Sequence, residues 1–331
     1  MTAELPEQVF PIAPNVVHDR SSVSVERLVS AFFGNKSPNT VLAYKRDLVD
    51  FAHFLGLTTL DEGAQRLFAV KHSGDANLMA LDYAEHLRGR NLAPKTIARR
   101  LVALRSLAKL GNMLGLVPWV ISTPGPKKPM PQRDVTGPAL AGVDMILAAA
   151  AKRKDAKGAR DVAMVRLLFD MGLRCFEVAG LDYGHVDDIA MKLSILGKGR
   201  SGRELLTIPD ETYEAVVRWL SFRGNEHGAL FFGLGRGTQE GRRLTPNGLR
   251  YTVARLGKLA LIEKRVTPHG LRHAAVTAAL DALNGDVRRV MRFSRHQSVV
   301  TVMAYDDARH DVAGEVAQTI ARPAPIEEVK S

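Results

Sequence analysis

The chain has 331 residues, a length that suggests two folded domains. Of these residues 46% are hydrophobic and 24% charged, a composition that excludes a chain disordered throughout. No run of apolar residues approaches the length of about 18 that a membrane-spanning helix needs, and no secretory signal is visible. The single cysteine excludes an internal disulfide framework and a cysteine-rich zinc module. The 46 Lys and Arg residues outnumber the 35 Asp and Glu residues, a net charge of +11 that favours a phosphate-facing surface over a basic composition kept only for solubility.

The N-terminal third predicts a small helical domain. Residues 1–22 mix proline, asparagine, valine and charges without a period and predict a flexible tail. Ser37–Thr40 and Ala93–Thr96 each place proline in the first turn of a helix, and apolar residues follow at intervals of three and four. We therefore predict a helical domain over 23–121, in which the arginines and lysine of 99–109 lie largely on exposed faces.

A proline-rich segment follows at 122–138. Five of its seventeen residues are proline, which lacks a backbone donor and disfavours helix in the residue before it. The segment predicts an extended basic linker. Two interpretations have equal weight: a plain spacer, or a strip that lies against a polyanion.

Residues 139–331 predict a second, mainly helical domain with one β element. Leu193–Leu196 and Leu205–Ile208 alternate around a glycine-containing turn at 197–202, which is typical of an antiparallel hairpin. The fold class expected for the whole chain is therefore mostly α with a small antiparallel β hairpin or sheet.

Polar residues suited to phosphate chemistry occur in five segments of this second domain. Arg174 follows a helix that ends in glycine, and Lys198 lies between two glycines at the hairpin turn. His269 and Arg272 stand three residues apart near a helix start, so they share one face. His296 then precedes an apolar stretch, and Tyr305 follows nine residues later.

In order and spacing these residues resemble the active-site signature of the tyrosine recombinases, the lambda-integrase family of site-specific DNA recombinases. The family order is Arg, Lys, His-x-x-Arg, His or Trp, then Tyr. The resemblance covers the second domain, as a catalytic domain, and extends more weakly to residues 23–119, which are similar to the helical core-binding domain of the family. One departure is Arg295, since many members have glycine before the histidine.

The residue types also suit the cutting of a DNA phosphodiester, which depends mostly on positioning and electrostatic stabilisation. Each guanidinium is a planar, permanently charged fork, so we assign Arg174 and Arg272 to the non-bridging oxygens of the scissile phosphate. Tyr305 is the expected nucleophile. Its phenol ordinarily has a pKa of about 10 and needs nearby positive charge or a base to react near neutrality.

The remaining residues of the set are assigned to proton transfer and support. His269 is the candidate acid or base, and Lys198 the general acid for the 5′-hydroxyl leaving group. His296 is expected to hydrogen-bond the phosphate. Glu177 is expected to hold an arginine of the site in position. His273 follows Arg272 directly and is expected to support the site without touching the substrate.

The family resemblance implies the rest of the cycle. The tyrosine becomes joined to a 3′-phosphate, and the freed 5′-hydroxyl of a partner duplex attacks that bond, so neither ATP, metal nor cofactor is needed. Two rounds of exchange pass through a four-way junction in a homo-tetramer on two double-stranded DNA sites, with a possible accessory DNA-bending or directionality protein. Residues 306–322 are expected to form a last helix that packs against a neighbouring protomer, and the enzyme is expected in the cytoplasm with the nucleoid.

Basic and polar residues at three predicted helix starts are candidates for DNA contact, with a solvated charged surface as the alternative. They are Thr40, Lys45, Lys95, Thr96, Arg99, Arg100, Arg243, Asn247 and Arg250.

Taken singly, each candidate has an ordinary explanation, such as a surface cation near a helix end or a histidine that caps a helix. The conjunction of six residues in one order favours a recombinase that integrates, excises, resolves or inverts DNA. The alternatives are a type IB topoisomerase-like enzyme that relaxes DNA as a monomer, and a DNA-binding protein without catalysis.

Overall fold

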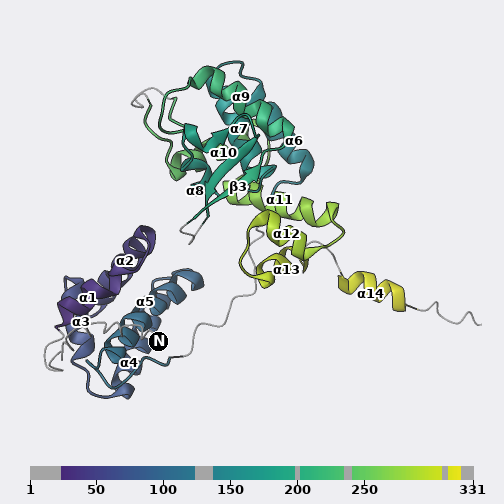
Figure 1. The fold of residues 1–331 in the computed structure, drawn as a ribbon. Helices are drawn as coiled ribbons and strands as arrows, with labels where there is room; N and C mark the ends of the chain where they lie inside the picture. The colour runs from purple at the N-terminus through teal and green to yellow at the C-terminus, as the bar shows by residue number, and fades with distance from the viewer. Residues whose placement is uncertain (1–23, 124–136, 198–201, 235–240, 308–311, 322–331) are drawn as a thin grey trace, which may run out of the picture. The chain divides into compact units, whose positions relative to one another are not determined.

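The computed structural model describes residues 24–123, 137–197, 202–234, 241–307 and 312–321 (Figure 1). The chain divides into two compact units, Met1–Gln132 and Arg133–Ser331. The predicted tail at 1–22, most of the predicted linker and the tip of the hairpin lie outside the described residues.

The described part of the first unit consists of helices. They are α1 (Val25–Gly34), α2 (Pro38–Phe54), α3 (Leu60–Phe68), α4 (Ser73–Gly89) and α5 (Pro94–Met113). The side chain of Ser37 accepts a hydrogen bond from the Thr40 amide at 3.3 Å at the start of α2, and proline stands in the first turn of α2 and of α5. Helix α3 was not predicted, although a reciprocal capping box between Thr59 and Glu62 marks its start.

Charged residues of α5 hold the first unit together. Arg100 pairs with Asp50 of α2, and its side chain is only 15% exposed; Arg99 pairs with the buried Asp47 of the same helix. The hydroxyl of Tyr83 on α4 donates to Asp50 at 2.8 Å. The prediction that these arginines lie on exposed faces is therefore wrong for Arg100, because its guanidinium links α5 to the carboxylates of α2.

The second unit places a small sheet among helices. Its elements are α6 (Leu140–Ala151), α7 (Ala156–Phe169), α8 (Cys175–Ala179), the 3-10 helix η1 (Tyr183–His185), β1 (Val186–Asp187), β2 (Lys192–Leu196), β3 (Arg203–Thr207), α9 (Asp210–Arg223), α10 (Pro246–Leu259), α11 (Pro268–Ala282), α12 (Val287–Ser294), α13 (Val299–Asp307) and α14 (Val312–Ile320). The strands pair antiparallel in the order β1-β2-β3. This confirms the expected mostly helical fold with a small antiparallel sheet, to which the structure adds β1.

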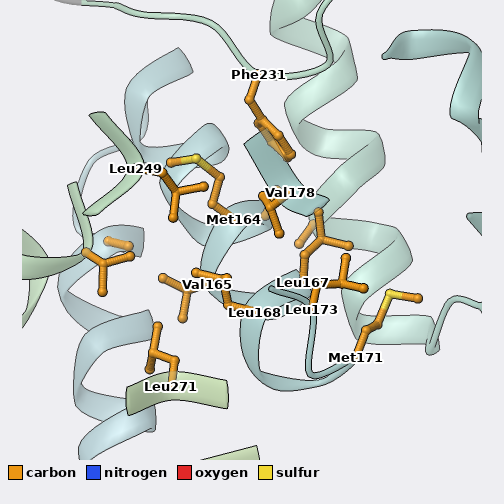
Figure 2. Close-up of a cluster of buried hydrophobic side chains, with 14 of the residues drawn as sticks. Met164, Val165, Leu167, Leu168, Met171, Leu173, Val178, Phe231, Leu249 and Leu271 are labelled. Atoms are coloured by element: carbon orange, nitrogen blue, oxygen red, sulfur yellow. The ribbon is translucent and has the colours of Figure 1, made fainter. Parts of the chain in front are cut away.

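Helix α7 is the centre of the main hydrophobic core. Met164, Leu167 and Leu168 are completely buried, and Figure 2 shows their side chains together with those of Leu249 on α10 and Leu271 on α11. Helices α6, α9 and α11 all pack on α7. The turn that follows α7 joins the same core through the buried side chains of Met171 and Leu173.

A second, smaller hydrophobic cluster joins helices α11, α12 and α13. Val276 and Leu280 of α11, Val290 of α12, Val302 of α13 and the ring of Tyr305 form it. Since Leu271 belongs to the main core, helix α11 lies in both clusters and connects them.

The predicted last helix over 306–322 is wrong at its start. Residues 306 and 307 end α13, the helix that carries Tyr305, and a separate helix α14 occupies Val312–Ile320. In the described parts of the chain, no helix combines the length and the apolar composition that a membrane crossing needs.

The end of the predicted linker is fixed to the second unit. A side chain at Gly137 would meet the carbonyl oxygen of Gly270 at 1.9 Å, so only glycine allows this close approach. The last residues of 122–138 therefore lie against the first turn of α11. The segment 124–136 lies outside the described residues.

Candidate active site

The turn after α7 positions Arg174. Gly172 has a φ of +54°, which reverses the chain, and Arg174 then begins α8. Its backbone amide donates to Glu177 Oε2 at 2.7 Å, and its Nη1 donates to Glu177 Oε1 at 2.9 Å. Its Nη2 donates to the carbonyl oxygen of Arg295 at 3.0 Å. The guanidinium is thus held on two sides while its side chain stays 23% exposed.

Glu177 is the carboxylate that holds Arg174 in place. Its side chain is fully buried, and it also accepts from Arg295 Nη2 at 3.0 Å. Burial alone would raise the pKa of Glu177, but the Arg174 amide and the guanidinium groups of Arg295 and Arg174 hold that pKa below its ordinary value. The carboxylate is therefore charged at neutral pH.

Helix α11 carries Arg272. Thr267 caps the helix by accepting from the Gly270 amide at 3.0 Å. Arg272 is 2% exposed and donates to the carbonyl oxygens of Gly172 and Ser294. Burial, followed by repulsion from neighbouring arginines, lowers the pKa of Arg272 to about 10, so the group stays charged at neutral pH.

His296 lies next to Arg272, with 3.4 Å between its Nε2 and Nη2 of the arginine. The hydroxyl of Ser294 lies 2.7 Å from His296 Nδ1 and fixes the orientation of the ring. Burial, and then repulsion from Arg272 and other cations, lowers the pKa of His296 to about 4. The imidazole is therefore neutral at pH 7.

Tyr305 reaches the same place from α13. Its ring centroid lies 5.8 Å from that of His296 and 4.3 Å from that of His273, and the residue is 8% exposed. Burial raises the pKa of Tyr305 although Arg272 and Arg174 both act to lower it. The phenol is thus protonated at neutral pH and must lose a proton before it can act as a nucleophile.

His269, on the first turn of α11, is suited to take that proton. The residue is exposed at the surface, yet the protein around its ring partly excludes water, and this together with repulsion from Arg272 and Arg174 lowers its pKa. Its own charge in turn lowers the pKa of His296. The electrostatic coupling of His269 to Arg272, Arg174 and His296 places it in the same group of residues. Its role as the acid or base stays a prediction.

The structure thus brings five of the six predicted catalytic residues into one site: Arg174, His269, Arg272, His296 and Tyr305. Lys198 lies outside the described residues. Glu177 holds Arg174, and the buried His273 packs against the ring of Tyr305. Among the described residues no group of three or more histidine, cysteine or acidic side chains is arranged to hold a metal ion.

Sequence reasoning missed three parts of the site. The carbonyl oxygens of Gly172 and Ser294 hold Arg272, and the Ser294 hydroxyl holds His296. Arg295 was recognised as a departure from the family pattern but was given no role. The signal that was available is the arginine itself, at a position where the family often has glycine.

The DNA-contact candidates of the second unit are placed at the start of α10. Asn247 and Arg250 are joined by a hydrogen bond of 2.6 Å, and Arg250 is exposed. Arg243 instead donates to the carbonyl oxygens of Ala179 and Leu181 and pairs with Asp182. Its guanidinium therefore already has partners inside the protein.

In the first unit the candidates differ in how they are engaged. Lys95 is exposed, Thr96 is half-buried, and Lys45 lies over the ring of Phe33. Thr40 shares a hydrogen bond with Ser37 at 2.9 Å. Arg99 and Arg100 are in the ion pairs described above. Contact with DNA phosphates stays a prediction for all nine residues.

A cavity of about 620 Å³ lies beside the Tyr305 ring. It is bounded by the segment that leads into α6, by α11 from His273 to Asp281, and by Tyr305 itself. Small side chains such as Ala274 and Ala278 line it.

Comparison with known proteins gives matches to family models in both units. Residues 141–311 match the phage integrase family, and residues 26–110 match the phage integrase N-terminal SAM-like domain. A tyrosine recombinase of Synechocystis sp. is 34% identical over 318 residues, covering 95% of this chain and 99% of that protein. The tyrosine recombinase XerC of Chromohalobacter salexigens is 30% identical and covers 85% of this chain and 90% of that protein.

Solved structures share the fold. The XerH site-specific recombinase bound to a palindromic difH substrate aligns with a TM-score of 0.64 at 18% identity, over 90% of this chain and 85% of that one. A lambda integrase dimer bound to a COC′ core site aligns with a TM-score of 0.62 at 12% identity, over 92% of this chain and 98% of that one.

Proposed function

The chain belongs to the phage integrase family of tyrosine recombinases, and we propose that Tyr305 is the nucleophile with which it cuts and rejoins DNA at specific sites. The observation that carries this proposal is that the Arg272 guanidinium and the Tyr305 ring both lie next to His296. Its ring lies 3.4 Å from the Arg272 guanidinium and 5.8 Å, between centroids, from the Tyr305 ring. A phenol beside a fixed guanidinium is suited to attack an anionic phosphorus centre.

In the proposed first step the Tyr305 oxygen forms a bond to the scissile phosphorus and His269 takes the phenolic proton. The bond from phosphorus to the 5′-oxygen breaks, and Lys198 gives that oxygen a proton. Arg174 and Arg272 bind the non-bridging oxygens, where negative charge increases in the transition state. The products are a 3′-phosphotyrosine and a free 5′-hydroxyl.

In the second step the 5′-hydroxyl of another duplex attacks the phosphotyrosine and gives its proton to Lys198. The bond from phosphorus to the Tyr305 oxygen breaks, and the phenol leaves with the proton that His269 holds. The energy of the phosphodiester is kept in the covalent bond, so rejoining needs no further energy source. We propose that two such exchanges occur in a tetramer on two double-stranded DNA sites, in the cytoplasm with the nucleoid. The DNA-bound structures of XerH and lambda integrase support DNA as the partner.

Covalent capture of DNA tests the proposal. The protein is incubated with sheared genomic DNA of its source, and adducts are trapped in denaturant and mapped by sequencing. We expect wild type to yield adducts at a small set of sites, and Tyr305→Phe to yield none, because the attacking oxygen is gone. Tyr213→Phe is the matched control, since it removes a phenol oxygen that only donates to the Asp188 carbonyl at 3.0 Å.

Binding of DNA without an adduct in wild type would contradict the proposal and favour a binding protein. The mapped site then supplies a duplex nicked beside the cleavage position, on which cleavage becomes irreversible and its rate measurable. Two copies of the mapped site on one plasmid show recombination directly, and relaxation of a plasmid that lacks the site would instead indicate topoisomerase activity.

The cleavage rate is expected to depend on the protonation of His269. Because the pKa of this histidine is lowered, the neutral base persists to a pH below its ordinary value of about 6.5. The rate on the nicked duplex should therefore rise with pH through a midpoint below about 6.5 and stay level at neutral pH. Single-turnover rates between about pH 5 and pH 8 measure this. His269→Ala should flatten the rise, and an unchanged profile would remove the base role from this residue.

We also propose that α14 docks on a neighbouring copy and so links protomers in the tetramer. The support is that residues 317–321 at the end of α14 are exposed, with Ile320 71% exposed. Removal of residues 312–331 should abolish the tetramer on DNA, seen in a gel or by light scattering, while one copy still binds one site. Unchanged tetramer assembly and cleavage rate in the shortened chain would show that this helix has no such role.

A further inference from the structure

Arg295 occupies a backbone conformation that favours glycine. Its φ is +54° and its ψ +39°, in the left-handed region, at the end of α12. For a residue with a Cβ this conformation is strained. The chain nevertheless has an arginine there and buries it to 9% exposure. A buried charge in a strained position needs partners that compensate it.

The partners of the Arg295 guanidinium are on the turn after α7, on α8 and at the end of α12. Its Nη2 donates to Glu177 Oε2 at 3.0 Å and to the Gly172 carbonyl at 3.3 Å. Its Nη1 donates to the carbonyl oxygens of Met171 and Phe293 at 3.3 and 3.2 Å. The guanidinium therefore ties the turn that precedes Arg174 to the segment that precedes His296.

The backbone of Arg295 also contacts Arg174 directly, since its carbonyl oxygen accepts from Arg174 Nη2 at 3.0 Å. Arg174 thus has two holds, Glu177 on one side and the Arg295 carbonyl on the other. Arg295 is part of both, because its guanidinium binds the same Glu177 carboxylate. Arg295 thus fixes the direction of the Arg174 guanidinium twice, directly through its carbonyl oxygen and indirectly through the Glu177 carboxylate that it binds.

Charge gives the arrangement a second consequence. Arg174, Arg272 and Arg295 are three positive groups and Glu177 is one negative group, so these four residues together carry two net positive charges. With glycine at 295 they would carry one. Glu177 would then be neutralised by Arg174 alone. A phosphodiester has one negative charge, and the five-coordinate transition state of its cleavage has two.

We infer that Arg295 is a positioning residue for the phosphate site: it neutralises Glu177 and orients Arg174, so that the full charge of Arg174 acts on the scissile phosphate. The inference rests on the proposed role of Arg174. A purely structural role, in which Arg295 only staples α12 to the turn after α7, predicts a different dependence on the charge of the phosphate.

The test compares two forms of the nicked duplex, one with an ordinary scissile phosphate and one with a neutral methylphosphonate in its place. Arg295→Gly keeps the left-handed backbone and removes the guanidinium. We expect it to lower the cleavage rate on the ordinary phosphate by about tenfold to a hundredfold. On the methylphosphonate, which lacks the charge that Arg174 stabilises, its rate should be close to that of wild type.

Two further variants complete the experiment. Asn284→Gly is the matched control, because Asn284 is also left-handed, with a φ of +49°, but is exposed; it should change neither rate. Arg295→Lys keeps the charge but not the planar fork. It should recover part of the loss on the ordinary phosphate. If Arg295→Gly does not fold, as thermal unfolding would show, the ratio of the two rates in Arg295→Lys decides the question in the same way.

Equal slowing on both substrates would overturn the inference and leave Arg295 as a structural staple. Wild-type rates on both substrates would overturn it as well. These outcomes differ from failure of the proposed function, in which wild type itself forms no covalent adduct with either duplex.

Discussion

Alanine at Arg272, and separately at Arg174, is expected to lower the cleavage rate on the nicked duplex by about a thousandfold or more. One arginine that stabilises a transferring phosphoryl group is worth at least this much in other enzymes. Both guanidinium groups are fixed before the substrate arrives, Arg174 by Glu177 and Arg272 by two main-chain carbonyls. Their loss should therefore affect the chemical step more than DNA binding, as single-turnover rates and gel shifts would show.

The two variants differ in their expected stability. Arg272→Ala removes the guanidinium donor of the Ser294 carbonyl, at a cost of about 1–3 kcal/mol for an unpartnered buried group, and leaves the Gly172 carbonyl with the Arg295 guanidinium at 3.3 Å. Arg174, in contrast, is partly exposed. Thermal unfolding separates this loss from catalysis, and Arg292→Gln, which removes an exposed charge from α12, is the control. Near-normal cleavage by both alanine variants would show that these residues do not form the phosphate clamp.

Lys198→Ala is expected to lower cleavage by roughly 10²- to 10⁴-fold, the usual worth of a general acid. A substrate with sulfur in place of the leaving 5′-oxygen should restore most of that loss. A thiol has a pKa of about 8.5 and leaves as the anion without a proton donor. Lys192→Ala, on the exposed start of β2, should cut both substrates at the wild-type rate.

Failure of the sulfur substrate to restore the rate in Lys198→Ala would count against the acid role. Slow cleavage of both substrates would instead indicate that this lysine binds the phosphate.

The order of chemical residue types was predictable from sequence because each lies next to a local signal. Proline and threonine mark the start of the helix that carries His269 and Arg272, and the alternating strands mark the hairpin that carries Lys198. A spacing of three residues on one helix is also a local fact. These features depend on neighbours within a few positions, so the fold class could be predicted from them. The grouping of the site residues was instead predicted from the resemblance to the tyrosine recombinases.

The hydrogen bonds and ion pairs that hold the site residues in place could not be predicted, because they join segments that are far apart in the sequence. The hydrogen bond from Arg174 to the Arg295 carbonyl joins residues 121 positions apart. The Arg100 side chain is largely buried because it pairs with the carboxylate of Asp50 on another helix. Helix α3 is the exception: its capping box is local, and the short apolar pattern after it was overlooked.

The two separate clusters of the second unit have a consequence for how the site would loosen. Tyr305 is seated in the small cluster with four other fully buried residues, whereas Arg174 stands on the turn after the large one. Tyr305 and Val302 hold α13 through this small cluster, whereas Arg174 and Arg272 also contact Glu177 and the Gly172 carbonyl next to the main core. Loosening of the small cluster would therefore move the Tyr305 phenol before it moved the turn that carries Arg174.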